Sequence, residues 1–354
     1  MKIAIVTVQV PFVRGGAEIL ADMLKKELIR RGHRAEIVTI PFKWYPWESL
    51  IDSMNMGRMM GLVDADGQKV DKVIALKFPA YYIQHENKVV WLLHQHRQAY
   101  DLWDTEYTDI QPLENGEEIR DFIRRCDNQY LREAKKIYTI ADTPTRRLAQ
   151  YNQISAETLY HPPMNYEKLH CESYGDYIFY ASRIDPIKRQ RLLVEAASFL
   201  KSDAKIILAG GGNVDEIDRL KTMIRERGLQ DRVSMAGFIT DEELWKLYGN
   251  CLGVYFGAYD EDYGYVTLEA FFAEKPVIVH RDSGGPLEFV TDGENGFVTE
   301  PDPKEIAEKI DLLYADRDLA RRLGQNGRKS LEEKNMNWDY VIQKLLSDPE
   351  ENQA

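Results

Sequence analysis

The sequence predicts an α/β protein made of two doubly wound, Rossmann-like domains, each with a parallel sheet. Short, continuously apolar runs rich in β-branched and aromatic residues alternate with helical patterns along the whole chain. Such strands are buried on both faces, which is typical of parallel sheets covered by helices. A chain of 354 residues is too long for one ordinary domain and suits two.

The first series of strands and helices begins at the N-terminus. The run "KIAIVTV" (2–8) reads as a strand, and the helix after it ends near Gly32. The apolar residues of this helix recur at helical spacing: Ile19, Leu20, Met23, Leu24 and Leu28. The other strands of this series are predicted at 35–40, 72–78, 88–93 and 135–140.

The pattern restarts after the proline-bearing segment "YHPPMN". Strands are then predicted at 177–181, 204–210, 232–237, 251–256 and 275–280. We therefore predict a first domain over 1–165, a second over 166–332, and a C-terminal helix within 333–354 that crosses back to the first. Ligands of such folds bind at the carboxyl ends of strands, so we expect a site in a cleft between the two domains, built from the loops that follow strands.

Composition and charge exclude several classes of protein. No run approaches 18 apolar residues, which argues against a membrane-spanning helix, and the apolar start reads as a strand because it lacks a small-residue cleavage site. The cysteines Cys126, Cys171 and Cys251 show no metal or redox spacing, as expected in the cytoplasm. A formal net charge of −12 argues against nucleic acid as a partner.

The charge is unevenly distributed along the chain. Residues 1–165 carry 22 basic and 22 acidic side chains, and the remaining residues carry 24 and 36. The neutral first half contains pairs of basic residues, which read as solvated helix faces or as a surface that contacts anionic lipid at the inner membrane. These pairs are Lys25-Lys26, Arg30-Arg31, Arg124-Arg125, Lys135-Lys136 and Arg146-Arg147. We expect a monomer or a weak dimer.

Glycines and cations follow several of the predicted strands. Gly15-Gly16 stands directly before the first helix, where the backbone can approach a ligand and free N–H groups attract an anion; a simple turn is the alternative. Arg183 and Lys188 follow the first strand of the second series, where a guanidinium fork and an ammonium point charge can hold a diphosphate. Gly211, after a later strand, would let a phosphate or a ribose approach the backbone closely; a plain strand-to-helix turn is the alternative.

The stretch "DEDYGYVTLEAFF" combines an acid in a loop, a glycine and an acid in a helix. Gly264 opens the predicted helix, so the N–H groups of Tyr265 and Val266 and the helix dipole favour an anion. Glu261 in the loop and Glu269 in the helix can accept hydrogen bonds from the vicinal hydroxyls of a ribose and a sugar.

Two histidines and two acidic tripeptides raise the question of a metal. His94 and His96 end a strand, but no further ligand is placed beside them, so contact with a sugar hydroxyl or a structural hydrogen bond fits better. Asp64-Ala65-Asp66 and Asp260-Glu261-Asp262 match a short acidic pattern that binds divalent metals, yet neither stands beside other ligands. We therefore expect neither a metal nor a cofactor.

Taken in order along the chain, these pieces resemble glycosyltransferase family 4, retaining enzymes of the GT-B fold. The resemblance covers most of the chain and is most specific between Tyr177 and Pro301. Its motifs are Gly15-Gly16-Ala17-Glu18, "SRIDPIK" with Arg183 and Lys188, the E-x7-E pair of Glu261 and Glu269, "SGGPLE", "DGENGFV" and "EPD". Tyr263 stands where the family has phenylalanine, and Ala273-Glu274-Lys275 replaces the family's alanine-glycine-lysine turn.

The resemblance implies a nucleotide-sugar donor and assigns roles around it. The diphosphate contacts that it implies are Arg183, Lys188, Gly16 and the helix start at Gly264, Tyr265 and Val266. Glu269 is implied to bind the ribose and Glu261 the transferred sugar, which His94 also contacts. The loop of Gly237, Phe238 and Ile239 is implied to hold the base.

Residues and resemblance together predict a retaining hexosyltransferase that needs no metal. Positive groups at the diphosphate would stabilise charge on the leaving group, and a front-face return is expected because no carboxylate nucleophile is evident. A UDP-sugar is the first expectation for the donor. The acceptor is expected to be a glycan, a lipid-linked molecule or a small molecule, in cell-surface polysaccharide or glycolipid synthesis. The alternatives are a nucleotide-sugar epimerase of the same fold and a non-catalytic nucleotide-sugar-binding protein.

Overall fold

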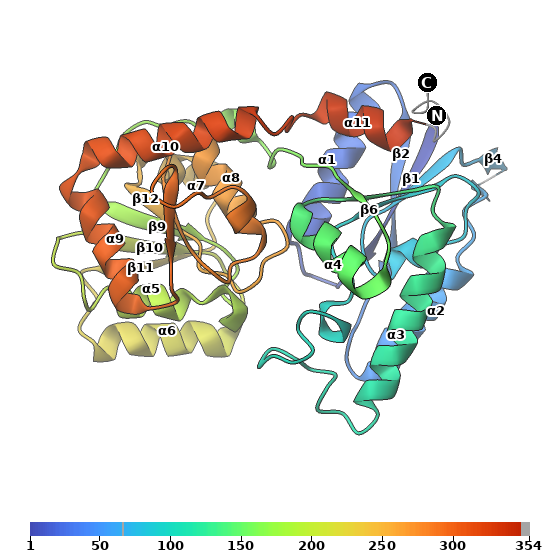
Figure 1. Ribbon diagram of the computed structural model, residues 1–354, viewed down its shortest axis with the longest axis horizontal. Helices are drawn as coiled ribbons and strands as arrows, with labels where there is room; N and C mark the ends of the chain where they lie inside the picture. The colour runs from blue at the N-terminus through green and yellow to red at the C-terminus, as the bar shows by residue number, and fades with distance from the viewer. Residues whose placement is uncertain (66, 348–354) are drawn as a thin grey trace. The chain divides into compact units, whose positions relative to one another are not determined.

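Two units, each with its own sheet, make up the chain: unit 1 is residues 1–164 with the C-terminal segment from Asn337, and unit 2 is residues 165–336. The computed structural model describes residues 1–65 and 67–347. In each unit, helices pack against a six-stranded parallel sheet (Figure 1). The predicted α/β fold with two doubly wound sheets is confirmed.

The sheet of unit 1 has the strand order β2-β1-β5-β6-β7-β8, and its neighbours all run parallel. Every residue of β1 from Ile3 to Val8 is buried, which explains its continuous apolar run. The sheet strands are β1 Lys2–Gln9, β2 Arg34–Pro41, β5 Lys72–Ala75, β6 Lys88–Leu92, β7 Lys136–Thr139 and β8 Glu157–Thr158. Strands β3 Asp64–Ala65 and β4 Gln68–Lys69 form a separate antiparallel pair.

The helices of unit 1 follow the predicted alternation with the strands. They are α1 Gly16–Arg30, α2 Trp47–Met59, α3 Gly116–Tyr130, α4 Asp142–Asn152 and α11 Trp338–Leu346, with short 3-10 turns η1 Ala80–Tyr82, η2 Arg97–Ala99 and η3 Leu131–Glu133. Buried residues of α2, α3 and α4 share one core cluster with strands β5 and β6, so these helices cover a common face of the sheet.

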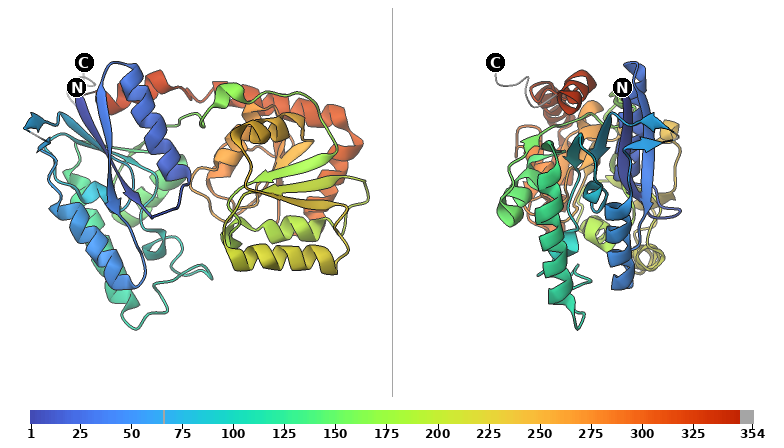
Figure 2. Two further views of the ribbon diagram at one scale, coloured as in Figure 1. Left: turned by 180° about the vertical axis from the view of Figure 1, so that it is seen from behind. Right: turned by 90° about the vertical axis from the view of Figure 1, so that its right-hand side faces the viewer.

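The sheet of unit 2 has the order β11-β10-β9-β12-β13-β14, again with parallel neighbours. Its strands are β9 Tyr177–Ala181, β10 Lys205–Ala209, β11 Val233–Gly237, β12 Gly253–Tyr255, β13 Val277–His280 and β14 Gly296–Thr299. Its helices are α5 Gln190–Ala196, α6 Val214–Glu226, α7 Asp241–Asn250, α8 Tyr265–Phe272, α9 Pro303–Ala315 and α10 Arg317–Glu332, with 3-10 turns η4 Tyr166–Lys168, η5 Pro186–Lys188 and η6 Gly285–Glu288. Helices α5 and α6 lie on one side of the sheet, and α7, α8 and α10 lie on the other (Figures 1 and 2).

Each sheet contains one point where the strand order reverses. In unit 2 the chain proceeds outward from β9 to β11 on one side and from β12 to β14 on the other, so the reversal lies between β9 and β12. In unit 1 it lies between β1 and β5. Loops diverge from the carboxyl ends of strands at such a point, and ligands of open α/β sheets bind there.

Helix α11 returns the chain to unit 1 after unit 2 is complete. Trp338 at its start is buried edge-on against Trp91 of β6, with ring centroids 6.1 Å apart. The buried Nζ of Lys72 donates to the carbonyl oxygens of Leu346 and Leu345 at 3.0 and 3.4 Å, which suits the negative end of a helix.

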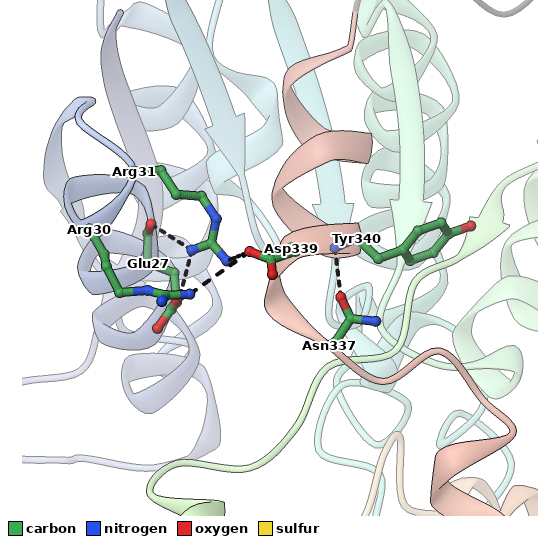
Figure 3. Close-up of polar contacts among 6 residues, drawn as sticks. All are labelled: Glu27, Arg30, Arg31, Asn337, Asp339 and Tyr340. Atoms are coloured by element: carbon green, nitrogen blue, oxygen red, sulfur yellow. Dashed lines mark hydrogen bonds and ion pairs between the residues drawn. The ribbon is translucent and has the colours of Figure 1, made fainter.

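A polar contact at the surface also joins α11 to α1 (Figure 3). The Asp339 carboxylate pairs with the guanidinium of Arg31, which also pairs with Glu27. Asn337 caps the helix by accepting a hydrogen bond from the N–H of Tyr340 at 2.8 Å.

Candidate functional site

Three loops of unit 2 are joined at the carboxyl edge of its sheet, beside the point of strand reversal. They follow β9, β12 and β13. Tyr259 N donates to Ile187 O at 2.9 Å, which joins the second loop to the first. Asp260 N donates to Asp282 O at 2.7 Å and Glu261 N to Ser283 O at 2.8 Å. Because the backbones are hydrogen-bonded to one another, side chains on this rim are held in fixed register.

Glycine is required where the third loop meets the second. Gly284 has a φ of +72°, and a Cβ atom there would lie 2.6 Å from the carbonyl oxygen of Glu261. At Gly285 a Cβ atom would lie 2.5 Å from the carbonyl oxygen of Asp262. The "SGG" sequence therefore allows one backbone to lie directly against another.

Lys188 and Glu261 meet on this rim although 73 residues separate them in sequence. The Nζ of Lys188 forms an ion pair with Oε2 of Glu261, and both side chains are mostly buried, 18% and 23% exposed. Tyr180 fixes the Lys188 backbone by donating its hydroxyl to the Lys188 carbonyl at 2.7 Å. The predicted phosphate-binding cation and the predicted sugar-binding carboxylate therefore adjoin, and each positions the other.

Arg183 leaves the same loop with its side chain largely in solvent, 59% exposed. Its nearest ionic partner is Asp185, at 3.3 Å. A guanidinium so placed is available to an external anion at little cost in desolvation.

Arg189, which was not predicted from the sequence, forms a second ion pair on the rim. Its two terminal nitrogens donate to the two carboxylate oxygens of Asp282 at 2.9 and 2.7 Å. The guanidinium also lies over the ring of Tyr259, 4.8 Å from its centroid. This bidentate pair fastens the β9 loop to the β13 loop. The only local signal for this pair was the position of Arg189 next to Lys188, because Asp282 lies 93 residues away in sequence.

Helix α8 begins where the sequence analysis placed it. Gly264 is its N-cap with φ +84°, and a Cβ there would lie 2.7 Å from Cγ of Pro286, so only glycine fits. The N–H groups of Tyr265 and Val266 stand in the first turn, where a helix offers no intrahelical acceptor. The helix start is therefore a local centre of positive potential next to Glu261.

Glu269 lies one turn further into α8 and is partly buried. Its Oε2 accepts a hydrogen bond from the hydroxyl of Tyr248 in α7 at 2.7 Å. Burial raises the pKa of Glu269 above its usual value, and the tyrosine bond opposes that rise. Tyr248 was not predicted; it sets the direction in which the carboxylate points.

The glycines after β10 have a structural explanation. Gly210 and Gly212 have φ angles of +132° and +155°, and Cβ atoms there would lie 2.1 and 2.2 Å from the carbonyl oxygens of Ser182 and Ile184. Both glycines let the end of β10 pack against the loop after β9. Gly211 has open space around its Cβ position, so a ligand approach remains a prediction for that residue alone.

The loop predicted to hold a base follows β11. Phe238 is almost wholly exposed, at 92%, and Ile239 is half-buried. Thr240 then caps α7 by accepting a hydrogen bond from the N–H of Glu243 at 3.3 Å. An exposed ring beside a helix start is available for stacking, and its role stays a prediction.

The predicted residues of unit 1 also follow strands. Gly15 caps α1, and its N–H donates to Oε2 of Glu18 at 2.8 Å, so an anion at Gly15 or Gly16 would compete with that carboxylate. His94 follows β6, with Nδ1 2.6 Å from the carbonyl oxygen of Gln95. His96 is buried against Phe78, with ring centroids 5.1 Å apart, and burial lowers its pKa to about 3.

The structure bears on the metal and membrane questions over residues 1–65 and 67–347. That part of the chain holds no group of three or more His, Cys, Asp or Glu residues that could bind a metal ion. Asp66, in one of the two acidic tripeptides, lies outside the described residues. None of the described helices has the length and apolar character needed to cross a bilayer.

Comparisons with known proteins point to one kind of protein. Residues 168–330 match the family model described as "Glycosyl transferases group 1". Over 157 residues the chain is 31% identical to the alpha-1,3/1,6-mannosyltransferase ALG2 of Dictyostelium discoideum, covering 41% of this chain and 37% of that protein. The chain thus spans little more than a third of that relative's length. It is 22% identical to an uncharacterized glycosyltransferase of Methanocaldococcus jannaschii, covering 98% and 97% of the two chains.

A solved structure shares the fold along the whole chain. HepE of Anabaena, solved in complex with UDP and glucose, is similar with a TM-score of 0.70 and 17% identity, and 98% of each chain is covered. At that identity the likeness establishes the fold alone.

Proposed function

We propose that this chain, whose residues 168–330 match the glycosyl transferases group 1 family within a GT-B fold, transfers a sugar from a nucleotide-diphosphate-sugar to an acceptor. The rim of unit 2 is the observation that carries the proposal. It places the Lys188–Glu261 pair, the exposed Arg183 and the start of α8 at the carboxyl edge of the sheet. Cations and helix N–H groups suit a diphosphate, and an adjoining carboxylate suits sugar hydroxyls.

In this proposal each predicted residue has one task. Arg183 and Lys188 hold the diphosphate with the N–H groups of Tyr265 and Val266. Glu261 orients Lys188 and binds the transferred sugar, while Glu269 binds the ribose. The remaining donor contacts stay as predicted from the sequence: Gly15, Gly16, His94, Gly211, Phe238, Ile239 and Gly264.

The chemistry follows from where charge develops. As the bond from the anomeric carbon to the diphosphate breaks, positive charge grows on the sugar and negative charge on the leaving oxygen. Arg183, Lys188 and the α8 start would stabilise that oxygen without a metal. We expect retention of configuration by front-face attack, with a leaving phosphate oxygen taking the proton of the acceptor hydroxyl.

A UDP-sugar is the first candidate for the donor, supported by the complex of HepE with UDP and glucose. A hexose is the expected cargo, supported by the mannosyltransferase relative. The acceptor would be a glycan, a lipid-linked molecule or a small molecule, in cell-surface polysaccharide or glycolipid synthesis. A monomer or weak dimer that works in the cytoplasm and contacts the inner membrane through the basic pairs of unit 1 is part of the proposal.

The test is a thermal-shift screen of UDP-, GDP- and ADP-sugars, followed by assays of nucleotide release. A bound donor raises the melting temperature by mass action. Release of free nucleotide that depends on an added acceptor supports transfer. Product formed without release would support an epimerase, and stabilisation without any turnover would support a binding protein.

Metal independence has its own test. Full activity in EDTA is expected because cations of the chain face the diphosphate. Activity that disappears in EDTA and returns with Mn²⁺ or Mg²⁺ would contradict this part of the proposal.

A further inference from the structure

Three aromatic side chains are exposed on loops at the carboxyl edge of the unit 1 sheet. Phe12 follows β1 and is fully exposed, while Trp44 and Tyr45 follow β2 and are 39% and 59% exposed. Exposed aromatic rings on adjoining loops are unusual on a water-facing surface and mark sites of interaction. None of the three has a task in the donor site described above.

The two loops leave the sheet side by side. Strands β1 and β2 are neighbours in register, with Gln9 opposite Pro41. Phe42 N donates to Gln9 O at 2.9 Å, which joins the loops at their origin. The side chain of Gln9 donates to the carbonyl oxygens of Val10 and Val13, both at 2.8 Å, and so braces the loop that carries Phe12.

The ring of Trp44 packs against Phe42, which is in turn anchored in the core. Its ring stacks on Phe42 at a centroid distance of 6.3 Å and an interplanar angle of 26°. Phe42 packs edge-on against the buried Phe78 at 6.3 Å. Tyr45 stands edge-on to Trp44 at 5.1 Å. The exposed rings are therefore held before a ligand arrives, which lowers the entropic cost of binding.

Phe12 is held in an unfavourable backbone conformation. Its φ is +64°, in the left-handed region where a bulky residue is an outlier. Strain of this kind persists where the surrounding structure enforces it, and it concentrates at functional sites. Here the residue in this conformation carries a fully exposed ring, on a loop that leaves the sheet next to the β2 loop.

We infer that Phe12, Trp44 and Tyr45 form a subsite that binds a sugar ring of the acceptor. This inference rests on the proposed function and adds that the acceptor is a glycan. One face of a pyranose presents C–H groups that pack against the negative face of an aromatic ring, as a positive ring edge does. The position at the carboxyl edge, next to the point of strand reversal between β1 and β5, is where α/β sheets bind ligands.

Charged side chains beside the rings can hydrogen-bond a sugar. Arg14, Lys43 and Glu48 are exposed beside the aromatic residues, and Nζ of Lys43 lies 5.1 Å from the centroid of the Tyr45 ring. Mixed charges can hydrogen-bond the hydroxyl groups at the edge of a sugar ring. Arg14 and Lys43 would attract anionic lipid and Glu48 would be repelled by it, so anionic vesicles are the competing ligand in the test.

The experiment compares three proteins: wild type, the double variant Trp44→Ala/Tyr45→Ala, and the control Met59→Ala. Met59 is an apolar side chain in α2 of the same unit and is 85% exposed, so its removal tests for a general loss of apolar surface. Each protein is titrated with gluco-, manno- and galacto-oligosaccharides by ligand-observed NMR. Each is also tested for co-sedimentation with anionic vesicles and melted with and without the stabilising nucleotide-sugar.

We expect wild type and Met59→Ala to bind at least one oligosaccharide equally well, and the double variant to bind it roughly tenfold more weakly or worse, the scale of losing an interface aromatic. Stabilisation by the nucleotide-sugar should be the same in all three. Equal oligosaccharide binding by the double variant overturns the inference, and so does the absence of binding by wild type. Loss of binding to anionic vesicles in the double variant, without oligosaccharide binding by wild type, would assign the rings to a membrane instead. If oligosaccharides bind through Trp44 and Tyr45 but no nucleotide-sugar stabilises any protein, the subsite stands and the proposed transfer fails.

Discussion

The carboxyl edges of the two sheets differ in what they offer a ligand. In unit 2 the loops are bonded to one another, and their side chains form charged pairs such as Lys188–Glu261 and Arg189–Asp282. In unit 1 the corresponding edge presents exposed rings, including Phe12 and Trp44. The unit 2 edge also exposes a ring, that of Phe238, so the two edges differ in the balance of charged pairs and exposed rings. This difference lies in the loops, so function in this chain must be read from loops rather than from the fold.

The largest expected effect is at Arg183, whose exposed guanidinium lies on the charged edge of unit 2. Arg183→Ala should lower kcat by roughly 100- to 1,000-fold, because the guanidinium stabilises charge that grows only as the diphosphate leaves. The measurement is steady-state kinetics with the donor found by the thermal screen. Arg183→Lys is the matched control and should recover part of kcat by keeping the positive charge. A normal kcat in a folded Arg183→Ala protein would show that the unit 2 rim is not the active site.

A second comparison concerns one buried histidine in each unit. In unit 2, His280 is hydrogen-bonded at both ring nitrogens, to the hydroxyls of Tyr255 at 2.8 Å and Thr299 at 2.9 Å. In unit 1, Nε2 of His96 has no hydrogen-bond partner among residues 1–65 and 67–347. His280→Phe should therefore lower the free energy of unfolding by roughly 2–4 kcal/mol at pH 7.5, because the hydroxyls of Tyr255 and Thr299 each lose a hydrogen-bond partner. His96→Phe should lower it by about 1 kcal/mol or less.

The pH dependence of the same variant has a defined sign. Burial lowers the pKa of His280 from 6.5 to about 4. The unfolded chain therefore takes up a proton at this residue before the folded one, so its contribution is present above pH 6.5 and is lost as pH falls to 4. The stability difference between wild type and His280→Phe should shrink by up to ~3 kcal/mol over that window. Chemical denaturation of both proteins at the two ends of this pH window measures the stability difference. A difference that does not change with pH would contradict the lowered pKa of His280.

A smaller effect is expected from Glu269, which would bind hydroxyls that do not change during the reaction. Glu269→Ala should raise the donor KM by roughly 10- to 100-fold with little change in kcat. Tyr248→Phe removes only the hydrogen bond that orients the carboxylate and should raise KM less. If Glu269→Ala lowers kcat as strongly as Arg183→Ala does, the two residues act on the same step and the division of tasks is wrong.

The smallest expected effect lies at the contact between α11 and α1. Asp339→Ala should change the free energy of unfolding by less than about 1 kcal/mol, because the carboxylate is largely exposed and surface ion pairs stabilise little. Trp338→Ala should cost roughly 3–5 kcal/mol, because it opens a cavity against Trp91. Urea titrations of both variants measure the two changes in the free energy of unfolding. Equal changes would contradict this prediction.

The alternation of strands and helices was predictable because parallel strands buried on both faces leave long apolar runs. The start of α8 was predictable too, because Gly264 stands directly before an apolar run that reads as a helix. Strands β8 and β14 were not predicted: Glu157–Thr158 and Gly296–Thr299 are edge strands too short to show a period. The Ala273-Glu274-Lys275 turn shows the cost of its missing glycine, because Glu274 adopts a φ of +53°.

Pairing within the candidate site could not be predicted. The sequence suggested Lys188 and Glu261 separately, but no local pattern relates positions 73 residues apart. Arg189 and Tyr248 were missed for the same reason, because the meaning of each depends on a partner from another loop or helix. Glycines 210 and 212 resemble ligand-binding glycines in sequence, and only the distances to Ser182 and Ile184 reveal a packing role.

The return of α11 to unit 1 has a consequence for the order in which the chain matures. Unit 2 is formally an insertion between the bulk of unit 1 and its last helix. During synthesis on the ribosome, every residue of unit 2 therefore emerges before unit 1 possesses the tryptophan that covers Trp91 and the helix end that Lys72 binds. Unit 1 begins to emerge first but lacks α11 until unit 2 has been made, so its Trp91 face stays uncovered until α11 has been synthesised.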